Sequence, residues 1–173
     1  MKGMTNVTGE LDIKDRWNLK IIKVESHEVK SYTPIGMAYV MMRNASFESK
    51  DISLSYKYGC VNTRDPFTIE CEEDSSACIV DFPGLSLLET RMFIQECLDM
   101  GNLSYMDGGT NTTAINPGRL GDPVINYVHF PAHMYQTLHT HPSHRVGLVI
   151  RGNGKIELDN KEYYDVNEGE IFF

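Results

Sequence analysis

Short runs of β-branched, aromatic and aliphatic residues, separated by polar turns, recur along most of the chain and constrain its fold more than any other feature. In the first half these runs cover residues 19–24, 37–42, 52–61, 67–71 and 77–82. Strands of this length and spacing are typical of domains in which two sheets pack face to face or close into a barrel. The sequence therefore predicts an all-β sandwich or barrel.

One segment between two β-rich stretches has a helical pattern instead. Ser86 and Glu89 are spaced as a capping box, in which each side chain satisfies the free backbone N–H of the other residue. After them, apolar side chains recur at helical spacing as far as Leu98, and Gly101 stands where a helix would end. We therefore expect a linker helix within residues 83–102.

The charge balance restricts the partners of the protein. Its 173 residues include 16 Lys and Arg against 24 Asp and Glu, which gives a formal net charge of −8. Such a chain lacks the basic face with which proteins neutralise the phosphates of nucleic acids or the headgroups of anionic membranes. No apolar run approaches the roughly 18 residues of a membrane span, and the polar N-terminus shows no signal peptide. We expect a cytoplasmic protein that binds neither nucleic acid nor membrane.

The segment 133–154 carries the residues from which chemistry is expected. Side chains two residues apart point to the same face of a strand, so His139 and His141 would project side by side. Two neutral imidazoles on one face supply half of the ligand set of a divalent metal ion. A pair of structural histidines on a half-buried strand is the simpler interpretation. Pro142 would end this strand and bend the chain into a loop.

The spacing around these histidines resembles the first motif of the cupin superfamily, G-x5-H-x-H-x(3,4)-E-x6-G. The two motif histidines fall on His139 and His141, and the closing glycine falls on Gly152. Arg145 occupies the position of the glutamate, and His133 occupies that of the opening glycine. The resemblance implies a cupin-type double-stranded β-helix, which is a jelly-roll barrel.

The resemblance extends over roughly residues 121–173. The second cupin motif begins at Gly169, and its histidine would lie beyond Phe173. We therefore expect a fragment, or a gene product cut before its last strands, with a cupin domain that is incomplete at its C-terminus. The third metal ligand of the family would then be missing, unless His133 or His144 replaces it.

These observations divide the chain into three expected parts. Residues 1–82 would form a β-rich N-terminal module, for which we add the hypothesis of a degenerate cupin half. Residues 83–102 would form the linker helix, and residues 103–173 the truncated cupin domain. This division rests on strand pattern, on the place of the helix and on the motif.

Arg145 is the clearest departure from the cupin motif, because a guanidinium cannot bind a metal ion. Either it turns away to pair with a carboxylate, or it approaches the metal with an anionic ligand between them. Cupins without the glutamate, such as the thiol dioxygenases, resemble this pattern and bind iron through three histidines. The family resemblance therefore still implies a divalent metal site at His139 and His141.

The strand expected after the histidines has two different faces. Val146, Leu148 and Ile150 alternate on one face and are expected in the core. The opposite face would border a ligand pocket, in which Gly147 either leaves room for a small molecule or simply allows tight packing of the strand. The further side chains expected near this pocket are His133, Tyr135, His144, Arg145 and Val149.

Three functions are compatible with these expectations. The first is a metal-dependent enzyme of the dioxygenase type, in which His139 and His141 bind iron or else manganese, nickel or zinc; no catalytic residue is assigned. The second is a non-catalytic ligand-binding or regulatory cupin, in which the first 100 residues supply the contacts of a homodimer. The third is a structural β module. In the first two, the ligand is a small molecule, and an anionic group on it would be held by Arg145.

Overall fold

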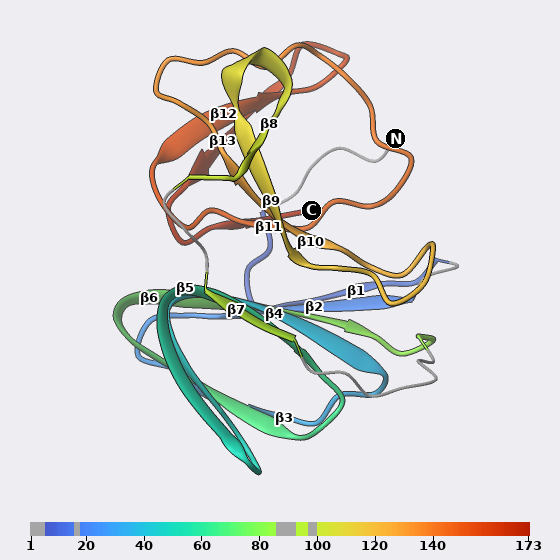
Figure 1. Cartoon of the computed structure of the whole chain (residues 1–173), viewed down its shortest axis with the longest axis vertical. Helices are drawn as coiled ribbons and strands as arrows, with labels where there is room; N and C mark the ends of the chain where they lie inside the picture. The colour runs from blue at the N-terminus through green and yellow to red at the C-terminus, as the bar shows by residue number, and fades with distance from the viewer. Residues whose placement is uncertain (1–5, 16–17, 86–92, 97–99) are drawn as a thin grey trace.

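A computed structural model describes residues 6–15, 18–85, 93–96 and 100–173 of the chain (Figure 1). In these residues antiparallel strands are connected by turns and loops, and the helical structure consists of one short 3₁₀ helix, η1 (Met106–Gly108). The all-β fold predicted from the sequence is therefore confirmed. The described part of the chain contains no helix long and apolar enough to cross a membrane.

A seven-stranded antiparallel sheet, which we call the large sheet, forms the lower half of the molecule in Figure 1. Its strands follow the order β1-β2-β6-β4-β5-β7, and β3 pairs with β6 outside this path. The long strands β4, β5 and β6 form its centre. The bounds are β1 (Glu10–Ile13), β2 (Leu19–Val24), β3 (Val29–Tyr32), β4 (Met37–Ser49), β5 (Ile52–Thr63), β6 (Phe67–Phe82) and β7 (Phe93–Glu96).

The prediction of a linker helix within residues 83–102 is wrong. Phe93–Glu96 form strand β7, which pairs antiparallel with β5 at the edge of the large sheet. Helical spacing of apolar residues is a weak local preference, and the unpaired N–H and C=O groups along β5 outweigh it by offering a ladder of hydrogen bonds. The expected capping residues Ser86 and Glu89 lie outside the described residues.

Strand β4 shows how the large sheet buries both of its faces. Side chains two residues apart point the same way, so Ala38, Val40 and Met42 lie in one core, while Tyr39 and Met41 contact apolar clusters on the opposite face. A strand that is buried on both faces needs apolar side chains at successive positions. This explains why the sequence of this strand reads as a continuous apolar run.

A bend in β4 closes a core within the large sheet itself. Asn44 has a φ of 50° and lies at a register shift between Arg43 and Ala45 in the pairing with β6. An irregularity of this kind bends the strand and increases its twist. Beyond it, the ends of β4, β5 and β6 curve away from the rest of the molecule, and Phe47 stacks on Phe67 with ring centroids 5.1 Å apart (Figure 1).

Three smaller sheets form an upper layer above the large sheet (Figure 1). One has the order β10-β9-β8, and the other two are the pairs β11–β14 and β12–β13. All of these pairings are antiparallel. The bounds are β8 (Leu103–Ser104), β9 (Thr110–Ile115), β10 (Ile125–His129), β11 (Gly147–Leu148), β12 (Asn153–Glu157), β13 (Tyr163–Asn167) and β14 (Ile171–Phe172).

Two apolar clusters join the upper layer to the large sheet. One lies between β2, β6 and β14 and includes Ile21, Val80 and Ile171. Val146 and Leu148, which were predicted to face the core, pack against this cluster as expected. The other cluster lies between β4, β5 and β9. The N-terminal and C-terminal stretches of the chain therefore share apolar cores.

A buried arginine also connects the two layers. Arg43 of β4 is only 4% exposed, and its Nη1 and Nη2 donate to the main-chain oxygen and the carboxylate of Asp74 at 2.6 and 2.8 Å. The same guanidinium donates to Ile150 O at 3.2 Å and pairs with Glu168 in the upper layer. Glu168 in turn accepts a hydrogen bond from Gly152 N at 2.9 Å. A single side chain thus fixes the turns around residues 150–152 and 168 to the large sheet.

Candidate functional site

The segment that carries the two histidines of the motif is irregular, and the strand predicted for it is not formed. Residues 130–146 have no strand assignment, and regular pairing begins only at Gly147. The backbone N–H of Thr137 donates to the carboxylate of Asp107 at 2.7 Å and not to a neighbouring strand. An alternating pattern forms a strand only where another strand is available to pair with it, and here a side chain takes that place.

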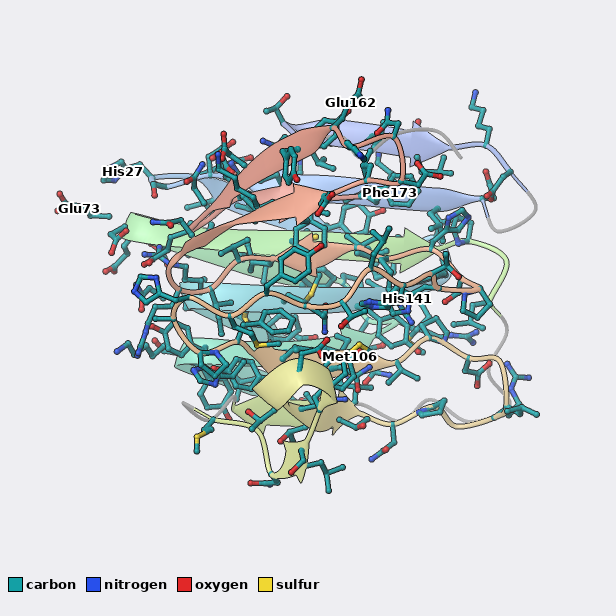
Figure 2. All side chains as sticks on the ribbon, turned by 90° about the horizontal axis from the view of Figure 1, so that it is seen from above. His27, Glu73, Met106, His141, Glu162 and Phe173 are labelled. Carbon is teal, nitrogen blue, oxygen red and sulfur yellow. The ribbon has the colours of Figure 1, made fainter. Side chains whose placement is uncertain are left out.

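His139 and His141 nevertheless meet, as their spacing had suggested. Their Nε2 atoms are 3.1 Å apart, and their rings are edge to face with centroids 4.8 Å apart. Both residues are exposed on the upper layer. Seen from above in Figure 2, His141 lies between Met106 and Phe173 in projection. The two imidazoles therefore form an accessible pair on the surface of this layer.

Hydrogen bonds at both ends of this pair determine where its protons lie. Arg145 can only donate, so Nδ1 of His141, 2.8 Å from Arg145 Nη2, must be the acceptor and the proton of the neutral ring lies on Nε2. The carbonyl oxygen of Thr137 can only accept, so His139 donates to it from Nδ1 at 2.7 Å. Nε2 of His139 is then free to accept from His141. One chain of hydrogen bonds runs from Arg145 through both rings to Thr137.

The surroundings of the pair favour the neutral form of His141. Partial burial, followed by the positive charge of Arg145, lowers the pKa of His141. At the other end, the hydrogen bonds from Thr137 lower the pKa of Asp107, so this residue holds the loop as a carboxylate. Asp107 adopts a φ of 56° within η1, and its carboxylate accepts the hydrogen bond from the backbone of Thr137. Asp107 carried no signal in the sequence, because its contact joins residues 30 positions apart.

For the predicted metal ion, the pair offers two imidazole nitrogens but no cluster of further ligands among the described residues. Among the described residues, no three or more His, Cys, Asp or Glu side chains gather closely enough to hold a metal ion. His144, which was considered as a third ligand, has its Nε2 2.6 Å from Asp15 Oδ2 and its ring 5.3 Å from that of Phe173. His133 is exposed in a turn with a φ of 62°. The metal ion stays a prediction from the motif.

The other residues expected around the pocket are distributed over the upper layer. Tyr135 is exposed and donates its hydroxyl to Glu157 at 2.9 Å. At Gly147, a Cβ atom would lie only 2.1 Å from Cζ of Phe172, so the ring of Phe172 fills the space that was expected to admit a ligand. Val149 is half-buried and exchanges backbone hydrogen bonds with Gly169 and Glu170. Of the predicted set, the structure brings together the two motif histidines and Arg145.

The all-β fold and the pair of motif histidines agree with a cupin-type domain in the C-terminal part of the chain. Comparison with known families gives the same result, since residues 121–173 match the family described as AraC-like ligand binding domain. That family has the cupin fold, which supports the resemblance to the cupin superfamily in this part of the chain. No curated protein and no solved structure matches the chain.

Proposed function

We propose that the part of the chain spanning residues 121–173 binds a small molecule, as a non-catalytic ligand-binding cupin. The observation that carries the proposal is the match of these residues to a family described by ligand binding. The matched range includes both motif histidines, Arg145 and the strands β11 to β14. A domain of this kind reports the presence of its ligand through a change in stability or conformation, and no bond need be made or broken.

We place the ligand at the surface formed by His139, His141 and Arg145. Small-molecule sites combine a few fixed polar groups with apolar side chains that cover the rest of the ligand. The three polar side chains are linked by hydrogen bonds at 3.1 and 2.8 Å, so their positions depend on one another. Tyr135 and Leu138, on the same loop, are 69% and 56% exposed and supply apolar surface nearby.

A metal-dependent oxygenase is the second candidate function. The observation that favours it is the approach of the two Nε2 atoms to 3.1 Å, because both could then lie at the usual distance of about 2.0–2.1 Å from one ion. Metal analysis after anaerobic addition of iron tests this candidate. The candidate would be excluded if the protein bound less than about 0.2 equivalents of iron, manganese, nickel, copper or zinc per chain.

Thermal unfolding of the whole chain with a panel of sugars and carboxylic acids tests the ligand-binding function. We expect at least one compound to raise the melting temperature in a saturable manner. At about 100 times Kd, binding adds roughly 2.7 kcal/mol, which corresponds to a rise of about 5–10 °C in a domain of this size.

Variants locate the binding site in the same experiment. The double substitution His139→Ala and His141→Ala should abolish the rise in melting temperature. Thr140→Ala, which changes the exposed residue between the two histidines, should leave it intact. A rise that survives the double substitution would place the ligand elsewhere, and no rise with any compound would contradict the proposed function.

A further inference from the structure

The arrangement of donors and acceptors at the site describes the ligand more closely. Resting on the proposed function, we propose that His139, His141 and Arg145 bind the carboxylate group of a small molecule, and not a metal ion. What this cluster can bind depends on which of its atoms still have a free lone pair or a free N–H.

Every lone pair of the two rings is already in use. Nδ1 of His141 accepts from Arg145, and Nε2 of His139 accepts from His141. The remaining ring nitrogens are donors, one toward the other ring and one toward Thr137 O. A metal ion binds to a nitrogen lone pair, so no ring nitrogen is ready to receive one. The cluster has no acceptor left.

Metal binding at Nε2 of His141 would also disturb its contact with Arg145. The proton displaced from Nε2 would move to Nδ1, where it would face the N–H of Arg145 at a separation of 2.8 Å between the nitrogens. Two donors cannot share a hydrogen bond, and the guanidinium charge would in addition repel the ion. A metal ion would therefore need Arg145 to leave its present position.

Donors, by contrast, remain available on Arg145. A guanidinium has five N–H groups, and in the described residues its hydrogen bond is the one from Nη2 to His141. The side chain is exposed, and no carboxylate of the described part of the chain forms an ion pair with it. A neutral imidazole is a weak partner for a guanidinium. A carboxylate, which can accept two parallel N–H bonds, is a stronger one.

No carboxylate of the described residues takes the place of a ligand beside Arg145. Asp107, the carboxylate at the far end of the hydrogen-bond chain, is engaged by the backbone of Thr137. A carboxylate on the ligand would contact Arg145 while the imidazole pair holds the guanidinium in place. The ligand class that this chemistry selects is a small organic acid whose remaining atoms lie over the apolar surface of the loop.

A nuclear magnetic resonance titration of the whole chain tests this inference. The probes are sodium benzoate and its neutral analogue benzamide, added at constant pH and ionic strength while the side-chain ¹⁵N signals of histidine and arginine are followed. We expect saturable shifts of the His141 and Arg145 signals with benzoate, and binding of benzamide at least about tenfold weaker, because it lacks the charge-assisted hydrogen bonds.

A charge-matched pair of variants accompanies the titration. Arg145→Gln should reduce benzoate affinity at least about tenfold, whereas Lys155→Gln, which removes an equal charge from an exposed pair, should leave it within about twofold. Circular dichroism verifies that both variants fold. The comparison of benzoate with benzamide on the unaltered chain does not depend on either variant.

The possible outcomes separate the two proposals. Equal binding of benzoate and benzamide, or unchanged benzoate affinity in Arg145→Gln, would overturn the carboxylate inference and leave ligand binding in place. Stoichiometric binding of Zn²⁺ that is lost in the double alanine variant of His139 and His141 would overturn it in favour of a metal site. Absence of binding by these probes and by every compound of the thermal panel would contradict the proposed function itself.

Discussion

Among single residues, Asp81 of β6 is completely buried and accepts three hydrogen bonds. Its carboxylate is 0% exposed and accepts from the hydroxyl of Tyr32 at 2.9 Å and from the backbone N–H groups of Ile35 and Gly36 at 2.7 and 3.1 Å. Burial, followed by the hydrogen bond to Asp81, raises the pKa of Tyr32, so its hydroxyl remains a donor at neutral pH. The carboxylate thereby fixes the connection between β3 and β4 to the centre of the large sheet.

Substituting Asp81 by asparagine should destabilise the protein by about 1–3 kcal/mol. The amide has only one oxygen to accept, and its NH₂ group would face a donor, so at least one buried N–H would lose its partner. Urea unfolding at pH 7 measures the loss. Tyr32→Phe removes a single donor and should cost less, and the prediction is wrong if Tyr32→Phe costs more than Asp81→Asn.

At the scale of elements, local sequence pattern predicted the strands that are buried, but not the parts of the chain whose structure depends on whether a strand edge is available to them. The apolar runs became β2, β4, β5 and β6, because burial on both faces requires such runs. The helix expected before Gly101 became in part β7, since the edge of β5 offers hydrogen bonds that local spacing does not reveal. The segment around His139 lacks its expected strand for the opposite reason, because no strand of the described residues pairs with it.

The candidate site was predictable to a similar extent. Motif spacing identified His139, His141 and Arg145, because the three positions lie close together in the sequence. Their hydrogen bonds were not predictable in the same way. The contact between Thr137 and Asp107, which holds the loop, spans 30 positions. Pairing of Arg145 with an imidazole was neither of the two alternatives that the sequence suggested.

The short pair β11–β14 depends on the absence of a side chain at Gly147. A Cβ atom there would lie 2.1 Å from Cζ of Phe172, so Gly147→Ala should force the ring away and destabilise the protein by about 1–3 kcal/mol. Gly154→Ala is a matched control on β12, because its Cβ would lie 3.9 Å from Val166. Thermal unfolding should show a clear loss for the first variant and little change for the second. Equal melting temperatures would mean that Phe172 does not cover Gly147 in solution.

At the scale of the whole molecule, the upper layer and the large sheet are held together by apolar clusters and by Arg43. The guanidinium of Arg43 is buried, while the two carboxylates that it pairs with are partly exposed, Asp74 at 77% and Glu168 at 40% of the side chain. Because water can solvate those carboxylates if the arginine is removed, the loss should be smaller than for a fully buried pair. The arginine itself also supplies hydrogen bonds to two backbone carbonyls, of Asp74 and Ile150.

Arg43→Met, which keeps much of the side-chain volume, should therefore destabilise the protein by about 2–3 kcal/mol, through the loss of several charge-assisted hydrogen bonds. Lys155→Met removes a partner of the exposed Asp165 and should change stability by less than about 0.5 kcal/mol. Urea unfolding curves of the two variants, measured side by side, provide the comparison. A loss for Arg43→Met no larger than that of the control would show that apolar contacts alone join the layers.

The same contact should make the protein sensitive to acid. The hydrogen bond from Gly152 N, and then that from Arg43, hold the pKa of Glu168 below its ordinary value of 4.5. A carboxyl that is more acidic in the folded than in the unfolded chain contributes stability above about pH 4.5, and this contribution is lost as the pH falls through the folded-state pKa. Glu168→Gln should therefore be less stable than the unaltered chain at pH 7, and the two should converge as the pH is lowered from 5 toward 3. Urea midpoints measured across this interval test the prediction, and curves that run parallel at all pH values would show that Gly152 and Arg43 do not hold the carboxylate of Glu168 in solution.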